Sequence, residues 1–296
     1  MPAQSTAVGG DDLEENYVLD THVTLAASDV DEESVHGEDH GAPPEERVTL
    51  GAQSHAESDK KRKRKVKEAE EGKSKKRKVE PAVSPPVDSP ACQPPSAISK
   101  YIEDKCKRTF KGISQMELED MLVPESSIVD TTSTFDRCRN LDSLSEFFRQ
   151  ATPRLHSRLT QKPQHYGAPT AIFLAGAALR VIDVVKKCRK LPGEKGGEVA
   201  KLFAKHIKVQ EQIDYLHTTK VSIAIGTPDR IGKLLASKAL QTTALTHIVI
   251  DATHRDSKNR SILDIPEVSK EVFNSVLGFG PLCDLVKAGK VEVVLF

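Results

Sequence analysis

The sequence is poor in cysteine, and its five cysteines are scattered without a Cys-x-x-Cys pair: Cys92, Cys106, Cys138, Cys188 and Cys283. The odd count and irregular spacing argue against a disulfide framework and a zinc site, and they suit a reducing compartment. The sequence has no run of eighteen apolar residues, and its first residues lack the basic-then-apolar pattern of a signal peptide. We therefore expect an intracellular protein that does not contact a membrane.

The sequence also lacks a phosphate-binding loop of the form GxxxxGK[ST]. In such a loop, glycine amides surround the phosphates and the lysine reaches the terminal ones. The Gly-Lys pairs at 72–73, 232–233 and 289–290 do not fit this pattern, and residues 135–155 contain no glycine. The histidines show no metal-ligand spacing either. We therefore expect no cofactor, no metal ion and no enzymatic activity.

The formal net charge is zero, but the charged residues are strongly segregated along the chain. Residues 1–59 carry fifteen Asp or Glu and a single Lys or Arg, Arg47, whereas residues 60–80 carry twelve Lys or Arg and four Glu. Residues 81–97 are dominated by Pro, Ser and Ala. Low hydrophobicity with blocks of like charge predicts disorder. We expect an acidic disordered tail over 1–59, a basic and Pro/Ser-rich linker over 60–97, and a folded domain over 98–296.

Two dense basic clusters lie in the expected linker: Lys60, Lys61, Arg62, Lys63, Arg64 and Lys65, then Lys75, Lys76, Arg77 and Lys78. Clusters of this kind in accessible chain are typical of nuclear localisation signals, and they also attract nucleic-acid phosphates. A solvated charge run without a specific partner is the alternative. We predict that a nuclear import receptor binds these clusters and that the protein is nuclear.

The rest of the sequence predicts helices first and then strands that alternate with helices. Helices are expected over 98–109, 114–122, 141–150, 153–159, 177–187, 209–216, 228–236 and 265–277. Strands are expected over 171–175, 199–204, 221–225, 247–250 and 291–296. Alternation of this kind implies right-handed crossovers and a mostly parallel sheet. We predict a three-layer α/β domain with about five strands and with the phenylalanines in its core.

Residues 221–251 carry the first resemblance, to the first RecA-like domain of DEAD-box RNA helicases. A strand leads to Thr-Pro-Asp-Arg at 227–230, a helix follows, and a second strand ends in Asp-Ala-Thr-His at 251–254. The resemblance implies a RecA-like fold over about 140–296. The chain departs from the helicase pattern at Ala252, which replaces the general-base glutamate, and at Asp229, which replaces a glycine. Arg180 is the nearest counterpart of the family's RNA-gripping arginine, displaced by one turn.

Three further segments resemble the Cms-one family of small-subunit pre-ribosome proteins more closely. They are KLFAKHIKVQ at 201–210, GTPDR at 226–230 and DIPE at 264–267. The resemblance implies a degenerate helicase-like domain, a place in the nucleolus, and association with the precursor of the small ribosomal subunit. It implies partners among pre-ribosomal RNA and assembly proteins, and a role in ribosome biogenesis and rRNA processing.

The candidate binding residues follow the predicted strands, at the edge where α/β sheets bind ligands. They are Lys205, His206, Lys208, Thr227, Arg230 and Arg255. The basic loop at 205–208 is either a contact for RNA or an acidic partner, or a solvated loop without a role. Arg230 either faces a partner or pairs with Asp229 or Asp251. An Asp251–His254 pair is conceivable as a catalytic pair, but no Ser or Cys motif completes it.

These observations favour a non-catalytic factor of small-subunit ribosome biogenesis in the nucleus and nucleolus. One alternative is a nuclear regulator of replication or transcription that binds protein only. The other is an atypical RNA-dependent ATPase, or a helicase half that works with a second chain.

Overall fold

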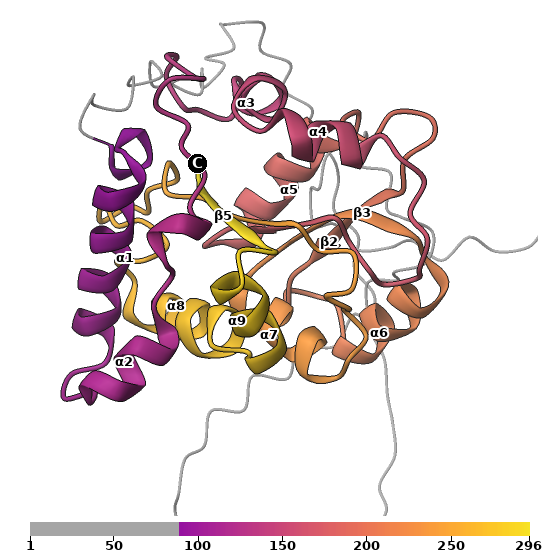
Figure 1. The fold of residues 1–296 in the computed structure, drawn as a ribbon. Coiled ribbons are helices and arrows are strands. Elements are labelled where there is room, and N and C mark those ends of the chain that lie inside the picture. The colour runs from indigo at the N-terminus through magenta and orange to yellow at the C-terminus, as the bar shows by residue number, and fades with distance from the viewer. Residues whose placement is uncertain (1–88) are drawn as a thin grey trace, which may run out of the picture. The chain divides into compact units, whose positions relative to one another are not determined.

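The computed structural model describes residues 89–296 (Figure 1). The predictions for the acidic tail and for both basic clusters lie outside the described residues.

Five parallel strands form the centre of the described domain, in the order β2-β3-β1-β4-β5. Their apolar runs, rich in Val and Ile, suit strands that are covered on both faces. This sheet confirms the five strands predicted from the sequence, to within two residues at each end. The strands are β1 (Ala171–Leu174), β2 (Glu198–Leu202), β3 (Val221–Gly226), β4 (His247–Ile250) and β5 (Glu292–Leu295).

Helices cover both faces of the sheet and complete a three-layer RecA-like fold, as predicted (Figure 1). One face carries α3 (Leu144–Gln150), α4 (Pro153–Leu159) and α5 (Ala178–Cys188). The other carries α6 (Val209–Thr218), α7 (Pro228–Ala236), α8 (Pro266–Glu271), the π-helical turn η3 (Val272–Leu277) and α9 (Gly280–Lys287). The chain therefore uses opposite faces for the connection from β1 to β2 and for the later connections.

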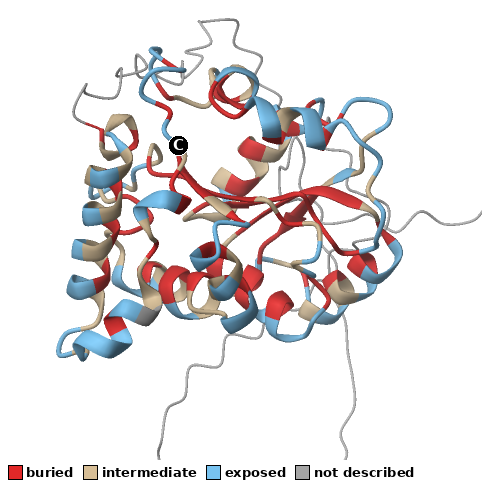
Figure 2. Ribbon diagram, in the orientation of Figure 1, coloured by how far each residue is buried: buried red, intermediate tan, exposed pale blue. Residues whose placement is uncertain are grey.

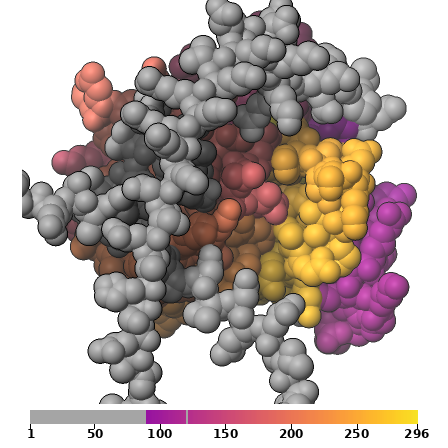
Figure 3. All heavy atoms as spheres, turned by 180° about the vertical axis from the view of Figure 1, so that it is seen from behind, coloured from indigo at the N-terminus to yellow at the C-terminus, as the bar shows by residue number. Residues whose placement is uncertain are grey.

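Two further helices, α1 (Pro95–Thr109) and α2 (Gln115–Met121), lie beside α8 and η3 (Figures 1 and 3). Short 3₁₀ turns precede and follow them, η1 (Pro90–Cys92) and η2 (Glu125–Ser127). The predicted capping box is confirmed, because Ser114 and Glu117 exchange backbone-to-side-chain hydrogen bonds of 3.2 and 3.0 Å.

The described domain includes residues that precede the expected start at residue 98. The turn η1 already belongs to the domain, because Ala91 is fully buried, and α1 begins three residues earlier than expected. Prolines such as those before residue 98 are typical of disordered chain, but a proline also fits the first turn of a helix, where its missing N–H costs nothing. The helix α9 was not predicted for the same reason, because its first residues, Gly280-Pro281, are also typical of a loop.

The core lies on both sides of the sheet, and the buried positions follow the strands and the inner faces of the helices (Figure 2). The prediction that the phenylalanines form core is confirmed for Phe147, Phe148, Phe173, Phe203 and Phe273, all of which are at most 6% exposed. Within residues 89–296, every helix is too short or too polar to cross a lipid bilayer.

Candidate partner-binding edge of the sheet

The strands β1 and β4 are neighbours, and the chain leaves their carboxyl ends toward opposite faces of the sheet. In open α/β sheets, such a switch point opens the crevice in which ligands bind. After β1, the chain continues through Gly176 into α5; after β4, it continues through Asp251 into a polar loop. Asp251 is the central charged group of this crevice and is fully buried.

The carboxylate of Asp251 is held by an arginine from α5. The Arg180 Nε atom lies 2.6 Å from Asp251 Oδ2, and its Nη2 atom lies 3.3 Å from Oδ1. The hydroxyl of Thr253 and the backbone amides of Thr253 and His254 donate to Oδ1 at 2.7, 3.2 and 3.2 Å. Both carboxylate oxygens therefore have partners inside the fold, and the negative charge is compensated by a guanidinium group.

This pair corrects the reading of Arg180 as a substitute for an RNA-gripping arginine, because the side chain is only 10% exposed and is bound to Asp251. One feature of the sequence indicates this pairing. Arg180 lies in the first turn of the helix after β1, and Asp251 directly follows β4. Opposite charges at the ends of adjacent strands predict such a contact.

His254 lies half-buried beside this pair. It borders a cavity of about 30 Å³ that is also lined by Gly176, Asp256 and Arg260. A cavity of that size holds about one water molecule. Burial and the Arg180 guanidinium lower the pKa of His254, so the ring is neutral at pH 7. Within the described domain, His254 contacts Asp251 through its backbone amide, which donates to Oδ1, and no hydrogen bond joins the His254 ring to this carboxylate. The conceivable catalytic pair is therefore not formed.

An aromatic cluster occupies residues 135–155, the segment in which the helicase resemblance places a phosphate-binding loop. The Phe147 ring centroid lies 5.2 Å from that of Phe135, 6.3 Å from that of Phe148 and 5.0 Å from that of Phe296. Arg139 lies over the Phe147 ring at 5.1 Å and is 1% exposed. The segment thus forms packed core in place of a glycine-rich loop.

Arg139 is bound within that core. Its Nη1 donates to the Leu295 carbonyl at 2.7 Å and its Nη2 to the Thr131 hydroxyl at 2.6 Å. Burial lowers its pKa. Just before this segment, the Val129 amide donates to the Val293 carbonyl at 3.0 Å, beside β5. Arg139 thus ties the segment to the carboxyl end of β5. No local sequence pattern indicates that Arg139 is buried.

The structure brings Lys205, His206 and Lys208 together on the loop that follows β2. Both lysines are exposed, and His206 is half-buried with a φ of 61°. The Gln212 side chain fixes the loop by donating to the Phe203 carbonyl at 3.2 Å. This edge of the sheet therefore presents two ammonium groups from a backbone that is anchored to α6.

Arg230 is corrected from a candidate contact to a structural residue. It is 4% exposed, and its guanidinium donates to Gln212 Oε1 at 3.1 Å and to the Ile207 carbonyl at 2.9 Å. The expected alternatives, a pair with Asp229 or Asp251, do not form either. Desolvation by burial lowers its pKa, while Asp229 and Glu211 act in the opposite sense. Arg230 supports the 203–208 loop from behind.

The remaining predicted residues lie elsewhere on the same edge. Thr227 is half-buried at the start of α7, and Arg255 is exposed with its Nη1 atom 3.2 Å from Asp264 Oδ2. The strands β2 and β4 are three strand spacings apart in the sheet. Three spacings of about 4.8 Å put the Lys205 loop and the Arg255 loop about 14 Å apart. The residues therefore share an edge without forming one cluster.

Fold and site together define a parallel α/β domain of the RecA-like class whose switch-point carboxylate is neutralised from within. A family model described as "CMS1: U3-containing 90S pre-ribosomal complex subunit" matches residues 46–296, and the chain belongs to this family. The resemblance noted from the sequence is thereby confirmed.

Curated relatives of this chain are named CMS1, cms1 or CMSS1. Protein CMS1 of Chaetomium thermophilum is 38% identical over 170 residues, which cover 57% of this chain and 66% of that protein. Protein cms1 of Schizosaccharomyces pombe is 33% identical, with coverage of 62% and 63%. Human Protein CMSS1 is 32% identical, with 61% of each chain covered. The matches thus span slightly less than two thirds of the relatives' length.

Solved structures are more distant. A DEAD box protein from Methanococcus jannaschii is 19% identical with a TM-score of 0.34, covering 53% of this chain and 37% of that one. An S. cerevisiae Dbp5 variant bound to RNA and ADP BeF3 is 15% identical with a TM-score of 0.35, covering 71% and 45%.

Proposed function

We propose that this protein is a non-catalytic nuclear and nucleolar factor of small ribosomal subunit biogenesis, and that it acts as a subunit of the 90S pre-ribosomal complex. Its family membership supports the association with that complex. The RecA-like domain serves as a rigid binding surface for pre-ribosomal RNA or assembly proteins. A fold retained without its original chemistry is expected where a surface, and not a cleft, is used.

The buried Arg180–Asp251 pair is the observation that carries the non-catalytic part of this proposal. Phosphoryl transfer in this class of fold needs a metal ion on such a carboxylate and a loop that holds the phosphates. Here both oxygens of Asp251 have partners within the fold, and the segment expected to hold phosphates forms an aromatic cluster.

The binding surface is the carboxyl edge of the sheet, which we define by Lys205, His206, Lys208, Thr227 and Arg255. Lys205 and Lys208 are exposed, and neither forms an ion pair within residues 89–296. Free ammonium groups on an anchored loop attract RNA phosphates or an acidic protein surface. The basic clusters at 60–65 and 75–78 supply nuclear import and additional affinity for RNA.

A charge reversal at the carboxyl edge tests this function. The double variant Lys205→Glu/Lys208→Glu is expected to raise the Kd for pre-ribosomal particles, measured by co-sedimentation, by about tenfold, or about 1.4 kcal/mol. Lys100→Glu/Lys111→Glu is the matched control, because both lysines are exposed near α1, away from the sheet edge. Equal sedimentation of the test and control variants would refute the assignment of this edge.

Affinity purification of the tagged protein separates the proposal from its alternatives. Enrichment of pre-ribosomal RNA and small-subunit assembly factors is the expected result. Enrichment of replication or transcription proteins without pre-ribosomal RNA would indicate a protein-only regulator.

Thermal denaturation with magnesium-ATP tests the ATPase alternative. A nucleotide at 100 times its Kd would stabilise the fold by about 2.7 kcal/mol. A clear rise in Tm with magnesium-ATP would therefore support the ATPase instead.

A further inference from the structure

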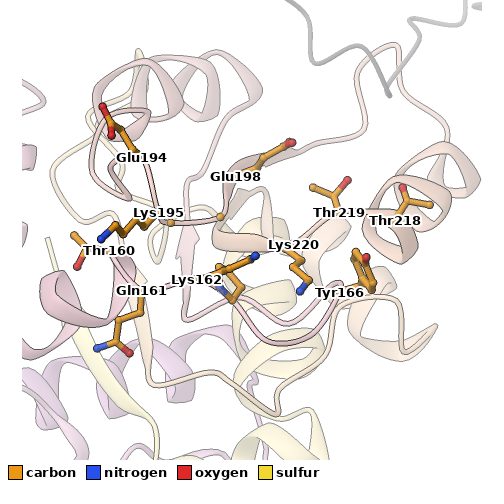
Figure 4. A pocket seen from close by; sticks show the side chains of 13 residues that line it. Thr160, Gln161, Lys162, Tyr166, Glu194, Lys195, Glu198, Thr218, Thr219 and Lys220 are labelled. Carbon is orange, nitrogen blue, oxygen red and sulfur yellow. The ribbon is translucent and has the colours of Figure 1, made fainter.

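A large groove lies at the opposite edge of the sheet, where the strands begin. Three loops form it, namely those that lead from α4 to β1, from α5 to β2 and from α6 to β3 (Figure 4). Its volume is about 920 Å³, near the top of the range of about 300–1,000 Å³ that is typical of ligand sites. The groove shares no residue with the carboxyl edge.

A glycine brings the three loops together. A Cβ atom on Gly197 would lie 2.5 Å from both the Lys220 carbonyl oxygen and the Pro163 Cγ atom. The Gly197 amide also donates to the Ser222 hydroxyl at 2.7 Å. The backbones approach so closely only because residue 197 has no side chain. The groove is therefore a defined feature of the packing and not a gap between independent loops.

Three lysines line the groove: Lys162, Lys195 and Lys220. Among residues 89–296, none of the three pairs with a carboxylate. Two glutamates also line the groove, but the Glu198 carboxylate accepts a hydrogen bond from Tyr215 at 2.9 Å. In Figure 4, the Lys162 and Lys220 side chains reach into the groove, whereas the carboxyl groups of Glu194 and Glu198 point away from them.

An exposed aromatic ring lies in the same groove. Tyr166 is 52% exposed, and the other exposed large hydrophobic side chains in the described domain, Met116 and Leu179, are not aromatic. The Lys220 Nζ atom lies 5.4 Å from the centroid of the Tyr166 ring. An accessible ring next to unpaired ammonium groups combines a surface for stacking with a site for phosphates.

We propose that this groove binds single-stranded nucleic acid. The phosphates lie among the ammonium groups of Lys162, Lys195 and Lys220, and one base stacks on Tyr166. Sites of this composition bind single strands, because the base faces of a duplex are already stacked. An acidic peptide would use the lysines but would leave the Tyr166 ring without a stacking partner. This inference does not rest on the proposed function, since it uses the other edge of the sheet.

Equilibrium binding of fluorescent twelve-nucleotide oligo(U) RNA and oligo(dT) DNA tests the proposal. The protein is the full chain with the basic clusters at 60–65 and 75–78 changed to glutamine, so that they do not mask the groove. Tyr166→Ala is expected to raise the Kd about tenfold, whereas Tyr166→Phe keeps it within about twofold because the ring remains. Equal affinities of the Ala and Phe variants would overturn the stacking site.

The lysines are tested through the salt dependence of the same binding. Each phosphate contact to a single strand contributes about 0.7 to the slope of log K against log salt concentration. Lys162→Gln/Lys220→Gln should therefore reduce the slope by about 1.4, whereas the control pair Lys100→Gln/Lys111→Gln leaves it unchanged. Circular dichroism confirms that each variant is folded.

The two probes separate the possible sources of the strand. Equal affinity for RNA and DNA supports a site that reads only phosphates and bases, and a preference for RNA supports additional contacts to the 2′-hydroxyl. An unchanged slope in the groove variant contradicts the proposal. A third outcome is that the protein binds polyglutamate but neither oligonucleotide, and that the groove variant loses this binding. That outcome would assign the groove to an acidic protein.

Discussion

At the scale of single residues, the Arg180–Asp251 pair decides what the switch-point crevice can do. Removing two charges from water costs several kcal/mol for each ion, and good geometry with further hydrogen bonds must offset this cost. Here the Thr253 hydroxyl and two backbone amides complete the set of donors to Asp251. The arrangement is consistent with a carboxylate that is held as part of the structure.

Removal of Arg180 is therefore expected to destabilise the fold strongly. Arg180→Met leaves the Asp251 carboxylate buried without its counter-charge, which typically costs about 3–5 kcal/mol. The double variant Arg180→Met/Asp251→Asn removes the buried charge and should recover a large part of this loss, since neighbouring residues in contact are not additive. Urea denaturation measures both free energies of unfolding.

Arg255→Met is the matched control for this experiment. It also removes an arginine–aspartate pair, but the Arg255 side chain is 38% exposed and the pair lies in a surface loop. Exposed pairs typically contribute about 0–1 kcal/mol. If Arg180→Met costs no more than this control, the pair at the switch point has no special structural weight.

At the scale of elements, the packing of α7 against η3 depends on a glycine inside the helix. Alanine normally stabilises a helix interior by about 0.5–1 kcal/mol relative to glycine. A Cβ atom on Gly232, however, would lie 2.4 Å from the Ser275 Cβ atom. We expect Gly232→Ala to destabilise the domain by about 1–3 kcal/mol, the usual cost of overpacking. Thermal and urea denaturation measure this loss.

Gly280→Ala provides the control, because a Cβ atom at the first residue of α9 would meet no atom within 4 Å. This change should be neutral or slightly stabilising. A stabilising Gly232→Ala would show that η3 moves away from α7 at little cost.

Most helices and strands of the described domain are predictable from the sequence. Apolar runs and helical spacing identified all five strands and most helices, because each signal is local. The helix α9 was not predicted, because its first residues, Gly280-Pro281, are equally typical of a loop and of a helix that begins with proline. The burial of Arg230 was missed because the buried face of α7 is set by α6 and the 203–208 loop, which are tertiary neighbours. The exposure of Lys205 and Lys208 agrees with their place after a strand.

At the scale of the whole described domain, the sheet separates two basic edges. Lys205 and Lys208 follow β2, whereas Lys162, Lys195 and Lys220 lie before the strands. The six residues of β3 measure this separation. Five steps of about 3.3 Å put the edges about 17 Å apart, beyond the distance at which substitutions usually couple. Each edge can therefore be altered without a direct effect on the other.

This separation predicts additive effects on association with the pre-ribosome, if both edges contact the same particle. Lys205→Glu/Lys208→Glu and Lys162→Gln/Lys220→Gln should each raise the Kd by some factor. In the quadruple variant, which carries all four substitutions, the Kd should rise by the product of these two factors, to within about a factor of two. Equilibrium binding to purified pre-ribosomal particles, with Lys100→Gln/Lys111→Gln as control, measures all three losses. If the quadruple variant binds no more weakly than one of the double variants, the two edges act through one shared contact. Loss of a contact to a phosphate changes the affinity. If Lys162→Gln/Lys220→Gln binds the particle as tightly as the unmodified protein, the groove therefore does not bind nucleic acid of this particle.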